Sequence, residues 1–132
     1  MPKSIMIVDD NEIIRHKLRN LFKRSADWVI CAEAENGVDA LEKARIFHPD
    51  FVVLDFNMPT MDGLEAAPKL KSISPKSSIV MLTAFKDSRL EEKAYQAGVS
   101  WVLSKMEACK VLDFARILLK PDTPPASSGT KN

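Results

Sequence analysis

Hydrophobic positions along the chain alternate between short continuous runs and stretches at helical spacing. The continuous runs predict five buried strands: Ile5–Val8, Trp28–Ala32, Phe51–Leu54, Ile79–Leu82 and Trp101–Leu103. Because apolar and polar residues do not alternate within these runs, each strand is expected to be covered on both faces. Such strands are typical of a parallel sheet enclosed by helices.

Apolar residues that recur every three or four positions after each run predict five helices. The expected landmarks are inward-facing Ile14, Leu18 and Phe22 in the first helix, an N-cap at Asn36, an opening at Asp62 and Gly63, an N-cap at Asp87 or Ser88 with an end at Gly98, and a last helix over Ala108–Leu119. Pro68 falls inside the third helix, where proline costs roughly 3 kcal/mol. That helix is therefore expected either to begin later or to be kinked in its first turns.

The order of these elements defines the fold class. Five strand–helix units with short, right-handed connections predict an α/β domain. The arrangement that fits best is a flavodoxin-like, doubly wound five-stranded parallel sheet in the order 2-1-3-4-5, with helices on both faces. The domain is expected to span residues 1–120, and the Pro- and Ser-rich residues 121–132 are expected to be disordered.

Composition narrows the functional classes. Lys and Arg number 19 against 18 Asp and Glu, so the net charge of +1 does not favour direct nucleic-acid binding. Neither a membrane-spanning stretch nor a signal peptide is present in the sequence, which favours a cytoplasmic protein without membrane contact. Cys31 and Cys109 lack metal or redox spacing and are expected to be reduced thiols. His16 and His48 likewise lack metal-ligand spacing.

Acidic residues follow two of the predicted strands. Asp9 and Asp10 end the first apolar run, and Asp55 ends the third. In the predicted strand order these two strands are neighbours, so the three carboxylates should share one crevice at the carboxyl edge of the sheet. Like charges this close require a cation. Hard carboxylate oxygens suit Mg²⁺, which is the expected cofactor.

Two further polar residues follow the fourth and fifth strands. Thr83 offers a hydroxyl and Lys105 an ammonium group. Metal, ammonium and hydroxyl would each contact one oxygen of a phosphoryl group during its transfer. Asp55, at the centre of the sheet, is best placed to attack in line, which would give an aspartyl phosphate.

The motifs that carry this chemistry resemble those of the response-regulator receiver domain of two-component signalling. The resemblance covers about residues 3–119 and rests on four segments: Val8-Asp9-Asp10-Asn11, Asp55-Phe56-Asn57-Met58-Pro59-Thr60-Met61-Asp62-Gly63, Leu82-Thr83-Ala84 and Ser104-Lys105. Each segment alone is a weak signal, but their order on these strands is specific to the family.

The resemblance implies a role for each matching residue. Asp55 matches the phosphoacceptor, which takes a phosphoryl group from a histidine kinase or a histidine phosphotransfer protein. Asp10 matches a direct Mg²⁺ ligand, Asp9 a neighbour that holds the metal through water, and Asn57 the residue whose backbone carbonyl completes the metal shell. The remaining matches are Thr83 with the hydroxyl that swings toward the phosphate, Lys105 with the lysine that pairs with it, Ala84 with the small residue that leaves the phosphate accessible, and Trp101 with the switch aromatic.

The resemblance also implies how the domain signals. Phosphorylation would draw Thr83 and Lys105 inward, and the space behind Thr83 would let Trp101 repack. An unidentified protein target would read the face formed by the fourth helix, fifth strand and fifth helix, with the domain a monomer or a weak phosphorylation-dependent homodimer. One departure is Met106, which replaces the proline that usually follows the lysine, so the Lys105–Met106 bond is expected to be trans. A second departure is Trp101 itself, which is bulkier than the usual switch aromatic of the family.

Three other interpretations compete with a stand-alone phosphoacceptor. A phosphohydrolase with an Asp nucleophile would need a second acid close to it, but Asn57 stands two residues after Asp55, which argues against an enzyme. A receiver fragment of a DNA-binding transcription regulator would use the Pro- and Ser-rich tail as a linker, although the end at Asn132 looks like a natural tail without an output domain. A phosphorylation-independent binding module is disfavoured by the complete acidic set.

Overall fold

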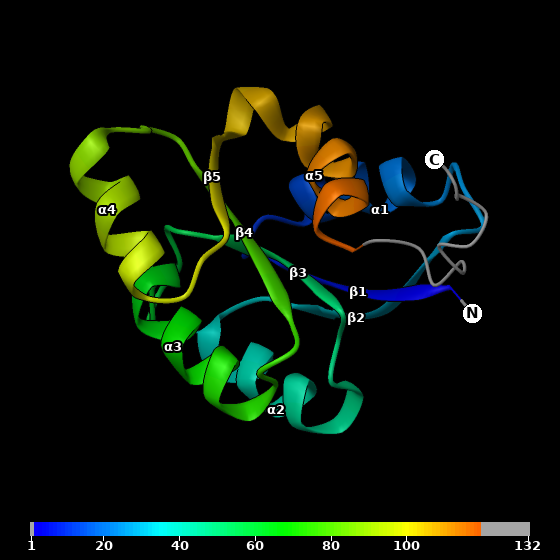
Figure 1. Ribbon diagram of the computed structural model, residues 1–132, viewed down its shortest axis with the longest axis horizontal. Coiled ribbons are helices and arrows are strands. Elements are labelled where there is room, and N and C mark those ends of the chain that lie inside the picture. Colours follow the sequence, from blue (N-terminus) through cyan, green and yellow to red (C-terminus); the bar gives the residue numbers. More distant parts are fainter. Residues whose placement is uncertain (1, 120–132) are drawn as a thin grey trace, which may run out of the picture.

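The computed structural model describes residues 2–119. Strands and helices alternate in the order β1 (Lys3–Val8), α1 (Glu12–Phe22), β2 (Trp28–Ala34), α2 (Gly37–Phe47), β3 (Phe51–Asp55), α3 (Gly63–Ile73), β4 (Ser78–Thr83), α4 (Ser88–Gln96), β5 (Trp101–Ser104), a 3₁₀ helix η1 (Lys105–Lys110) and α5 (Val111–Leu118). The five strands are parallel and lie in the order β2-β1-β3-β4-β5 (Figure 1). The predicted fold class and strand order are therefore confirmed.

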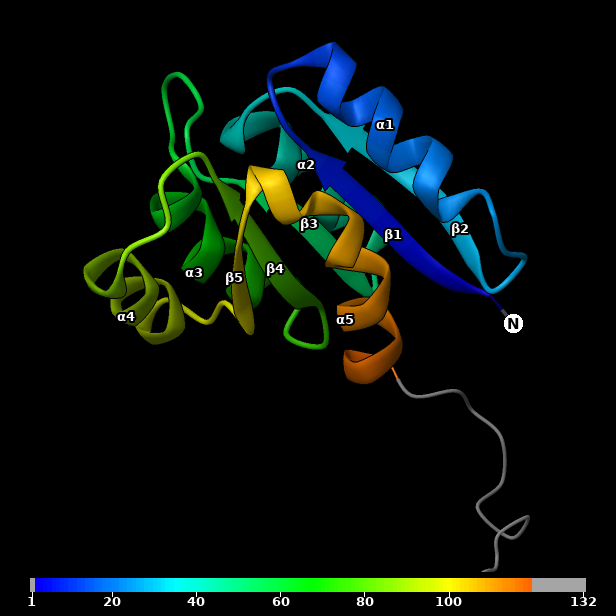
Figure 2. The ribbon, with the colours of Figure 1, turned by 90° about the horizontal axis from the view of Figure 1, so that it is seen from above.

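Helices cover both faces of the sheet, with α1 and α5 on one side and α2, α3 and α4 on the other (Figures 1 and 2). Alternate residues of each strand enter the two cores, so that Ile5 and Ile7 face α1 and α5 while Met6 and Val8 face the other three helices. Phe22 of α1 makes edge-on ring contacts with Trp28 and Phe51 in the first core. This division explains why consecutive residues in the middle of the strands, such as Ile5–Val8, are apolar.

Side-chain caps fix where the helices begin, in agreement with the sequence. The N-caps accept backbone hydrogen bonds from the first turn: Asn11 from Ile13 at 2.8 Å, Asn36 from Asp39 at 2.8 Å, Asp62 from Glu65 at 2.9 Å and Asp87 from Leu90 at 2.8 Å. Gly98, with φ of 100°, follows the end of α4 in a conformation that favours glycine.

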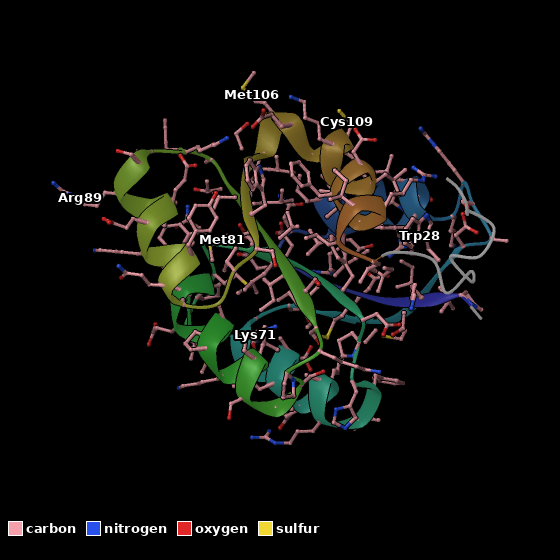
Figure 3. The ribbon with its side chains drawn as sticks, in the orientation of Figure 1. Trp28, Lys71, Met81, Arg89, Met106 and Cys109 are labelled. Atoms are coloured by element: carbon pink, nitrogen blue, oxygen red, sulfur yellow. The ribbon has the colours of Figure 1, made fainter. Side chains whose placement is uncertain are left out.

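The predicted last helix over Ala108–Leu119 begins too early. Residues Lys105–Lys110 form a 3₁₀ helix, and α5 starts only at Val111. The reason is local, because the backbone N–H of Ser104 donates to Glu107 Oε1 at 3.1 Å and closes a tight turn directly after β5. The Lys105–Met106 bond is trans, as expected, and Met106 projects outward from this turn (Figure 3).

Three sequence predictions concern the extent and setting of the domain. The predicted tail, residues 121–132, and the expected boundary at residue 120 lie outside the described residues. Within residues 2–119, no helix has the length and apolar character that crossing a bilayer requires. Cys31 and Cys109 are both free thiols, with Cys31 half-buried and Cys109 exposed.

Pro68 lies in the interior of α3, which begins immediately after Asp62 and continues to Ile73. The expectation of a later start is therefore wrong. Asp62 and Glu65 form a reciprocal capping box that stabilises the first turn. Pro68 is exposed, and its ring leaves the Leu64 carbonyl without the usual helical donor.

Replacing Pro68 by alanine should therefore stabilise the protein. Pro68→Ala restores the missing backbone donor, and the gain outweighs the larger entropy of the unfolded chain, for a net increase of roughly 1–2 kcal/mol in the free energy of unfolding. Urea denaturation measures this directly. Lys69→Ala, at the next exposed position of the same helix, is the control and should change stability by less than about 0.5 kcal/mol. An unchanged Pro68→Ala variant would mean that α3 is not regular at this point.

Candidate functional site

Three carboxylates meet at the carboxyl edge of the sheet. Val8 of β1 pairs with Leu54 of β3, so the residues that follow them, Asp9 and Asp55, lie side by side. One oxygen from each of Asp9, Asp10 and Asp55 lies within 4.8 Å of the other two. Asp9 and Asp55 are each only 1% exposed, whereas Asp10 is exposed. The structure therefore brings together the acidic residues that the sequence placed at one edge.

Each buried carboxylate has one oxygen that accepts a hydrogen bond and one that does not. Asp9 Oδ1 accepts from the backbone N–H of Asn11 at 2.8 Å, and Asp55 Oδ1 accepts from that of Asn57 at 3.3 Å. Lys105 Nζ lies 3.1 Å from Asp55 Oδ1 and 3.7 Å from Asp9 Oδ2. Within the described residues, the Oδ2 atoms of both aspartates are buried without a hydrogen bond.

Burial and mutual repulsion shift the acid–base behaviour of this pocket. Burial, followed by the charge of Asp9, raises the pKa of Asp55 from 3.8 to about 6. Burial also raises the pKa of Asp9, against the opposing effects of the Asn11 N–H and of Lys105. For Lys105, burial alone would lower the pKa, but the hydrogen bond and charge of Asp55 outweigh it and raise the pKa.

These donors fit a hard divalent cation. Two buried carboxylate oxygens lack hydrogen bonds, and the exposed Asp10 carboxylate lies beside them at the pocket's open side. An ion such as Mg²⁺, which prefers oxygen ligands and retains several waters, suits a site that is partly buried and partly open. The chemistry of the donor set therefore agrees with the cofactor expected from the sequence.

Thr83 and Lys105 come to the same edge from the next two strands. Thr83 ends β4 and pairs with Ser104, the last residue of β5, so Lys105 emerges one residue beyond it. The Thr83 hydroxyl is held loosely by the backbone of Phe85, with both contacts at 3.3 Å. Ala84 is exposed beside it and leaves the pocket open.

Trp101 is not placed as expected behind Thr83. It pairs with Val80, three residues before the Thr83–Ser104 pair, and its side chain is on the sheet face opposite to that of Thr83. The position on the Thr83 face belongs to the fully buried Val102. Trp101 is instead 42% exposed and stacks on Phe114 of α5, with ring centroids 5.1 Å apart. A route through space behind Thr83 is therefore wrong for this residue.

The backbone at Gly63, directly after Asp62, packs too closely on β3 to leave room for a side chain. A Cβ atom at this position would lie 2.7 Å from the Asp55 carbonyl oxygen and 3.0 Å from Phe56 Cα. The Gly63 N–H donates to the Phe56 carbonyl at 2.9 Å. The first turn of α3 thus packs directly on the backbone that carries Asp55.

Sequence reasoning missed two features around the pocket. One is a groove of about 310 Å³ between the β3–α3 loop and α4, whose lining includes Phe56, Asn57, Thr83, Phe85 and Arg89. The other is Glu107, which accepts from the Ser104 N–H and so shapes the turn that carries Lys105. The spacing Ser104-x-x-Glu107 is a capping-box signal that would have found it.

Fold and pocket together define a doubly wound α/β domain with an acidic site at the topological switch point, where three carboxylates could hold a metal ion. Residues 5–115 match the family described as the response regulator receiver domain. The chain belongs to this family, whose members are the signal-receiving domains of two-component response regulators.

Individual relatives support the same assignment. The transcriptional regulatory protein LnrK of Bacillus subtilis is 39% identical over 101 residues, which are 76% of this chain and 46% of LnrK. The chemotaxis protein CheY of Halobacterium salinarum is 35% identical over 105 residues, or 80% of this chain and 86% of CheY. The chain thus spans about half of the first relative and most of the second.

Solved structures agree in fold. A LuxR-family response regulator from Aurantimonas sp. is 29% identical, with a TM-score of 0.82 over 89% of this chain and 86% of that one. CheY6 from R. sphaeroides, in complex with the P1 domain of CheA3, is similar over 91% of this chain and 98% of that one, at 28% identity and a TM-score of 0.76.

The raised pKa of Asp55 predicts a pH-dependent stability when divalent ions are absent. Its folded-state pKa of about 6 exceeds the unfolded value of 3.8, so the folded state binds the extra proton and stability falls as pH rises through this window. The ionised carboxylate costs on the order of 3 kcal/mol above pH 6. Asp55→Asn should therefore be more stable than the native protein by ~1–3 kcal/mol at pH 7.5, because the neutral amide removes the buried charge; the pKa of about 6 already includes the opposing effect of Lys105.

Urea denaturation in EDTA at pH 7.5 and pH 4 tests this prediction. The gain should largely disappear near pH 4, because Asp55 is then almost fully protonated in the folded state and close to its pKa of 3.8 in the unfolded chain. Asp27→Asn, which changes an exposed carboxylate just before β2, is the control and should show no such pH-dependent gain. Equal stability of Asp55→Asn and the native protein at pH 7.5 would contradict the buried-charge account.

Proposed function

We propose that residues 1–120 form a phosphoacceptor switch that takes a phosphoryl group on Asp55 with the help of Mg²⁺. The observation that carries this proposal is the pair of buried oxygens on Asp9 and Asp55 that accept no hydrogen bond, beside the ammonium group of Lys105. Two buried carboxylates whose oxygens are not all hydrogen-bonded destabilise a fold, so their presence points to a functional role. Carboxylates with strongly shifted pKa values also cluster at functional sites.

The donor in this proposal is the phosphohistidine of a histidine kinase or phosphotransfer protein. A carboxylate oxygen of Asp55 attacks phosphorus, the P–N bond to imidazole breaks, and the imidazole nitrogen leaves with the bonding electrons. The product is an acyl phosphate on Asp55. The reported complex of CheY6 with a CheA3 domain supports this class of partner.

Each residue of the pocket has a part in that step. Asp10 and Asp55 would hold the metal directly, Asp9 through water, and Asn57 through its backbone carbonyl; bound Mg²⁺ supplies charge neutralisation of the phosphoryl oxygens. Lys105, already 3.1 Å from Asp55, pairs with one phosphoryl oxygen. The hydroxyl of Thr83 donates to another once it turns from Phe85, and the small side chain of Ala84 leaves the donor room to approach.

Signalling in this proposal runs through the face formed by α4, β5 and α5. Tyr95, Trp101 and Phe114 place aromatic rings on these three elements. The ring centroids are 6.3 Å apart for Tyr95 and Trp101 and 5.1 Å apart for Trp101 and Phe114. Trp101 contributes here through its contacts with α4 and α5. An inward shift of Thr83 and Lys105 would pull on the β4–α4 loop and on η1, which border this face, and so bias a pre-existing equilibrium.

A second candidate is the receiver of a longer, DNA-binding transcription regulator. The similarity to LnrK over 46% of its length favours it. Both candidates share the same phosphoacceptor chemistry. The mass of the native protein, captured from its source with an antibody against this domain, separates them by showing either a chain of this size or a larger one.

Phosphorylation itself is tested by intact mass. Incubation with acetyl phosphate and Mg²⁺ should add one phosphoryl group to the native protein, because Asp55 is the buried carboxylate at the end of the central strand, with Lys105 Nζ 3.1 Å from its Oδ1. The addition should require Mg²⁺ and be absent from Asp55→Asn. No added mass, or equal addition to Asp55→Asn, would overturn the proposal. Aryl phosphate should not be turned over catalytically.

The signalling face is tested by the side-chain resonances of the two tryptophans. With Mg²⁺ saturating, phosphorylation should shift the Trp101 indole N–H signal in two-dimensional NMR. The Trp28 indole, which lies on β2 at the sheet edge opposite to β5, is the internal reference and should shift less. Asp55→Asn should show neither change. A phosphorylated protein whose Trp101 signal does not move would exclude this route.

A further inference from the structure

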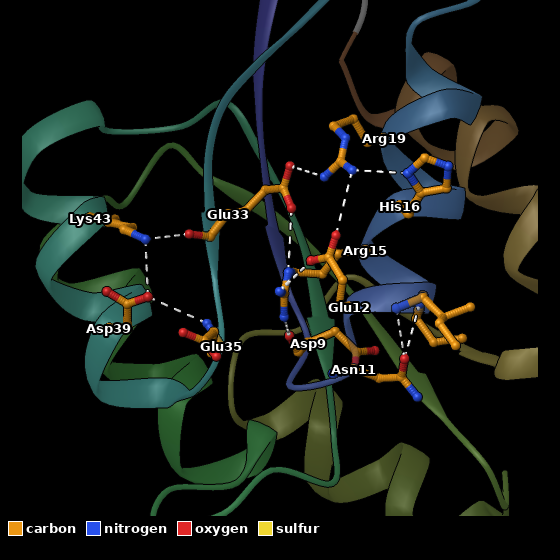
Figure 4. Close-up of polar contacts among 12 residues, drawn as sticks. Asp9, Asn11, Glu12, Arg15, His16, Arg19, Glu33, Glu35, Asp39 and Lys43 are labelled. Atoms are coloured by element: carbon orange, nitrogen blue, oxygen red, sulfur yellow. Dashed lines mark hydrogen bonds and ion pairs between the residues drawn. The ribbon is translucent and has the colours of Figure 1, made fainter.

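A partly buried polar network lies behind the metal-binding loop, on the side of α1 and β2 (Figure 4). Arg15 of α1, whose side chain is 12% exposed, donates from Nη1 to the backbone carbonyl of Asp9 at 2.6 Å. The other nitrogens of the same guanidinium contact Glu33 of β2 at 3.3 Å and Glu12 at 2.6 Å. Arg15 is thus held by two carboxylates while it binds one carbonyl.

Glu33 is itself anchored from two helices. Its carboxylate oxygen Oε2 forms an ion pair with Arg19 Nη1 of α1 at 2.5 Å, and its backbone carbonyl accepts a hydrogen bond from Lys43 of α2. Lys43 also pairs with Asp39 at 3.0 Å. The orientation of the Arg15 guanidinium is therefore set by elements on both sides of β2, and a planar, forked donor is suited to such multiple fixed contacts.

The contact with the Asp9 carbonyl has a geometric consequence. The Asp9 N–H donates to the Ala34 carbonyl at 3.0 Å, so Asp9 is fixed through both its N–H and its carbonyl. The Asp9 carbonyl and the Asp10 nitrogen belong to one planar peptide unit. Fixing the carbonyl therefore also fixes the direction in which Asp10 leaves β1, and with it the start of the Asp10 side chain.

We propose that Arg15 is a positioning residue for the metal site, which it preorganises by clamping the Asp9–Asp10 peptide from behind. The inference rests on the proposed function, since it concerns affinity for the same Mg²⁺. Arg15 contacts no carboxylate of the pocket, so its effect is carried by the backbone. Groups that orient metal ligands in this way typically change metal affinity by about 10- to 100-fold when removed.

Electrostatics alone predicts the opposite sign. Arg15 is a positive charge near a cation site, so its removal would by itself favour Mg²⁺ binding. A loss of affinity in Arg15→Met thus reports positioning rather than charge. Lys17→Met is the matched control, because it removes the same charge from an exposed position of the same helix. Among the contacts of the described residues, Lys17 has none with Asp9, Glu12 or Glu33.

The experiment is Mg²⁺ titration by calorimetry of the native protein and these variants, with urea denaturation in EDTA to show that each is folded. Arg15→Met should bind Mg²⁺ about tenfold more weakly, and Lys17→Met within about twofold of native. Arg15→Lys, which keeps the charge but cannot span three partners, should also bind more weakly and serves if Arg15→Met does not fold.

A second readout separates positioning from general damage. With acetyl phosphate as donor, the Mg²⁺ concentration for half-maximal phosphorylation should rise in Arg15→Met, while the rate at saturating Mg²⁺ stays near native. Equal or tighter Mg²⁺ binding by both Arg15 variants would overturn the inference while leaving the proposed function intact. A native protein that binds no Mg²⁺ would instead overturn the proposed function.

Discussion

The burial of Asp9 and Asp55 side by side is the constraint on which the rest of the site depends. Parallel strands that are neighbours at the switch point end at the same level, so two strand-terminal carboxylates are forced together. Lys105 offsets only part of the repulsion, because it lies closer to Asp55 than to Asp9 and leaves both Oδ2 atoms without hydrogen bonds. The pocket is therefore destabilising by itself and becomes favourable only when positive charge enters it.

Such a pocket persists because several hydrogen bonds and close packing contacts hold the backbone around the two carboxylates in place. The Asn11 and Asn57 N–H groups fix one oxygen of each buried carboxylate, and Asn11 also caps α1. Close packing at Gly63 holds the backbone of Asp55 from α3. Asn11 thus serves twice, because its side chain caps α1 while its backbone N–H orients the Asp9 carboxylate.

Local patterns were enough to predict the strands, the caps, the sheet order and the meeting of three acids, because each follows from periodicity or connection rules. Trp101 was misplaced because three consecutive apolar residues give no signal of which face each side chain takes, and only pairing with β4 decides it. Arg15 was missed for another reason. Its partners are a backbone carbonyl and Glu33, a residue on another strand, so a charged position on an amphipathic helix gave no local sign of burial.

The two halves of the pocket differ in how firmly they are held, and this difference fits a switch. The Asp9 half is tied by short contacts through Arg15, Glu33 and Lys43, as expected of a preorganised metal site. The contacts that hold the Thr83 hydroxyl and join the two loops beside it are longer: the hydroxyl bonds Phe85 at 3.3 Å, and Lys86 reaches Glu107 at 3.9 Å. Phosphate on Asp55 would therefore leave the first half in place and rearrange the second, because weakly held elements respond to a new charge at the lowest cost.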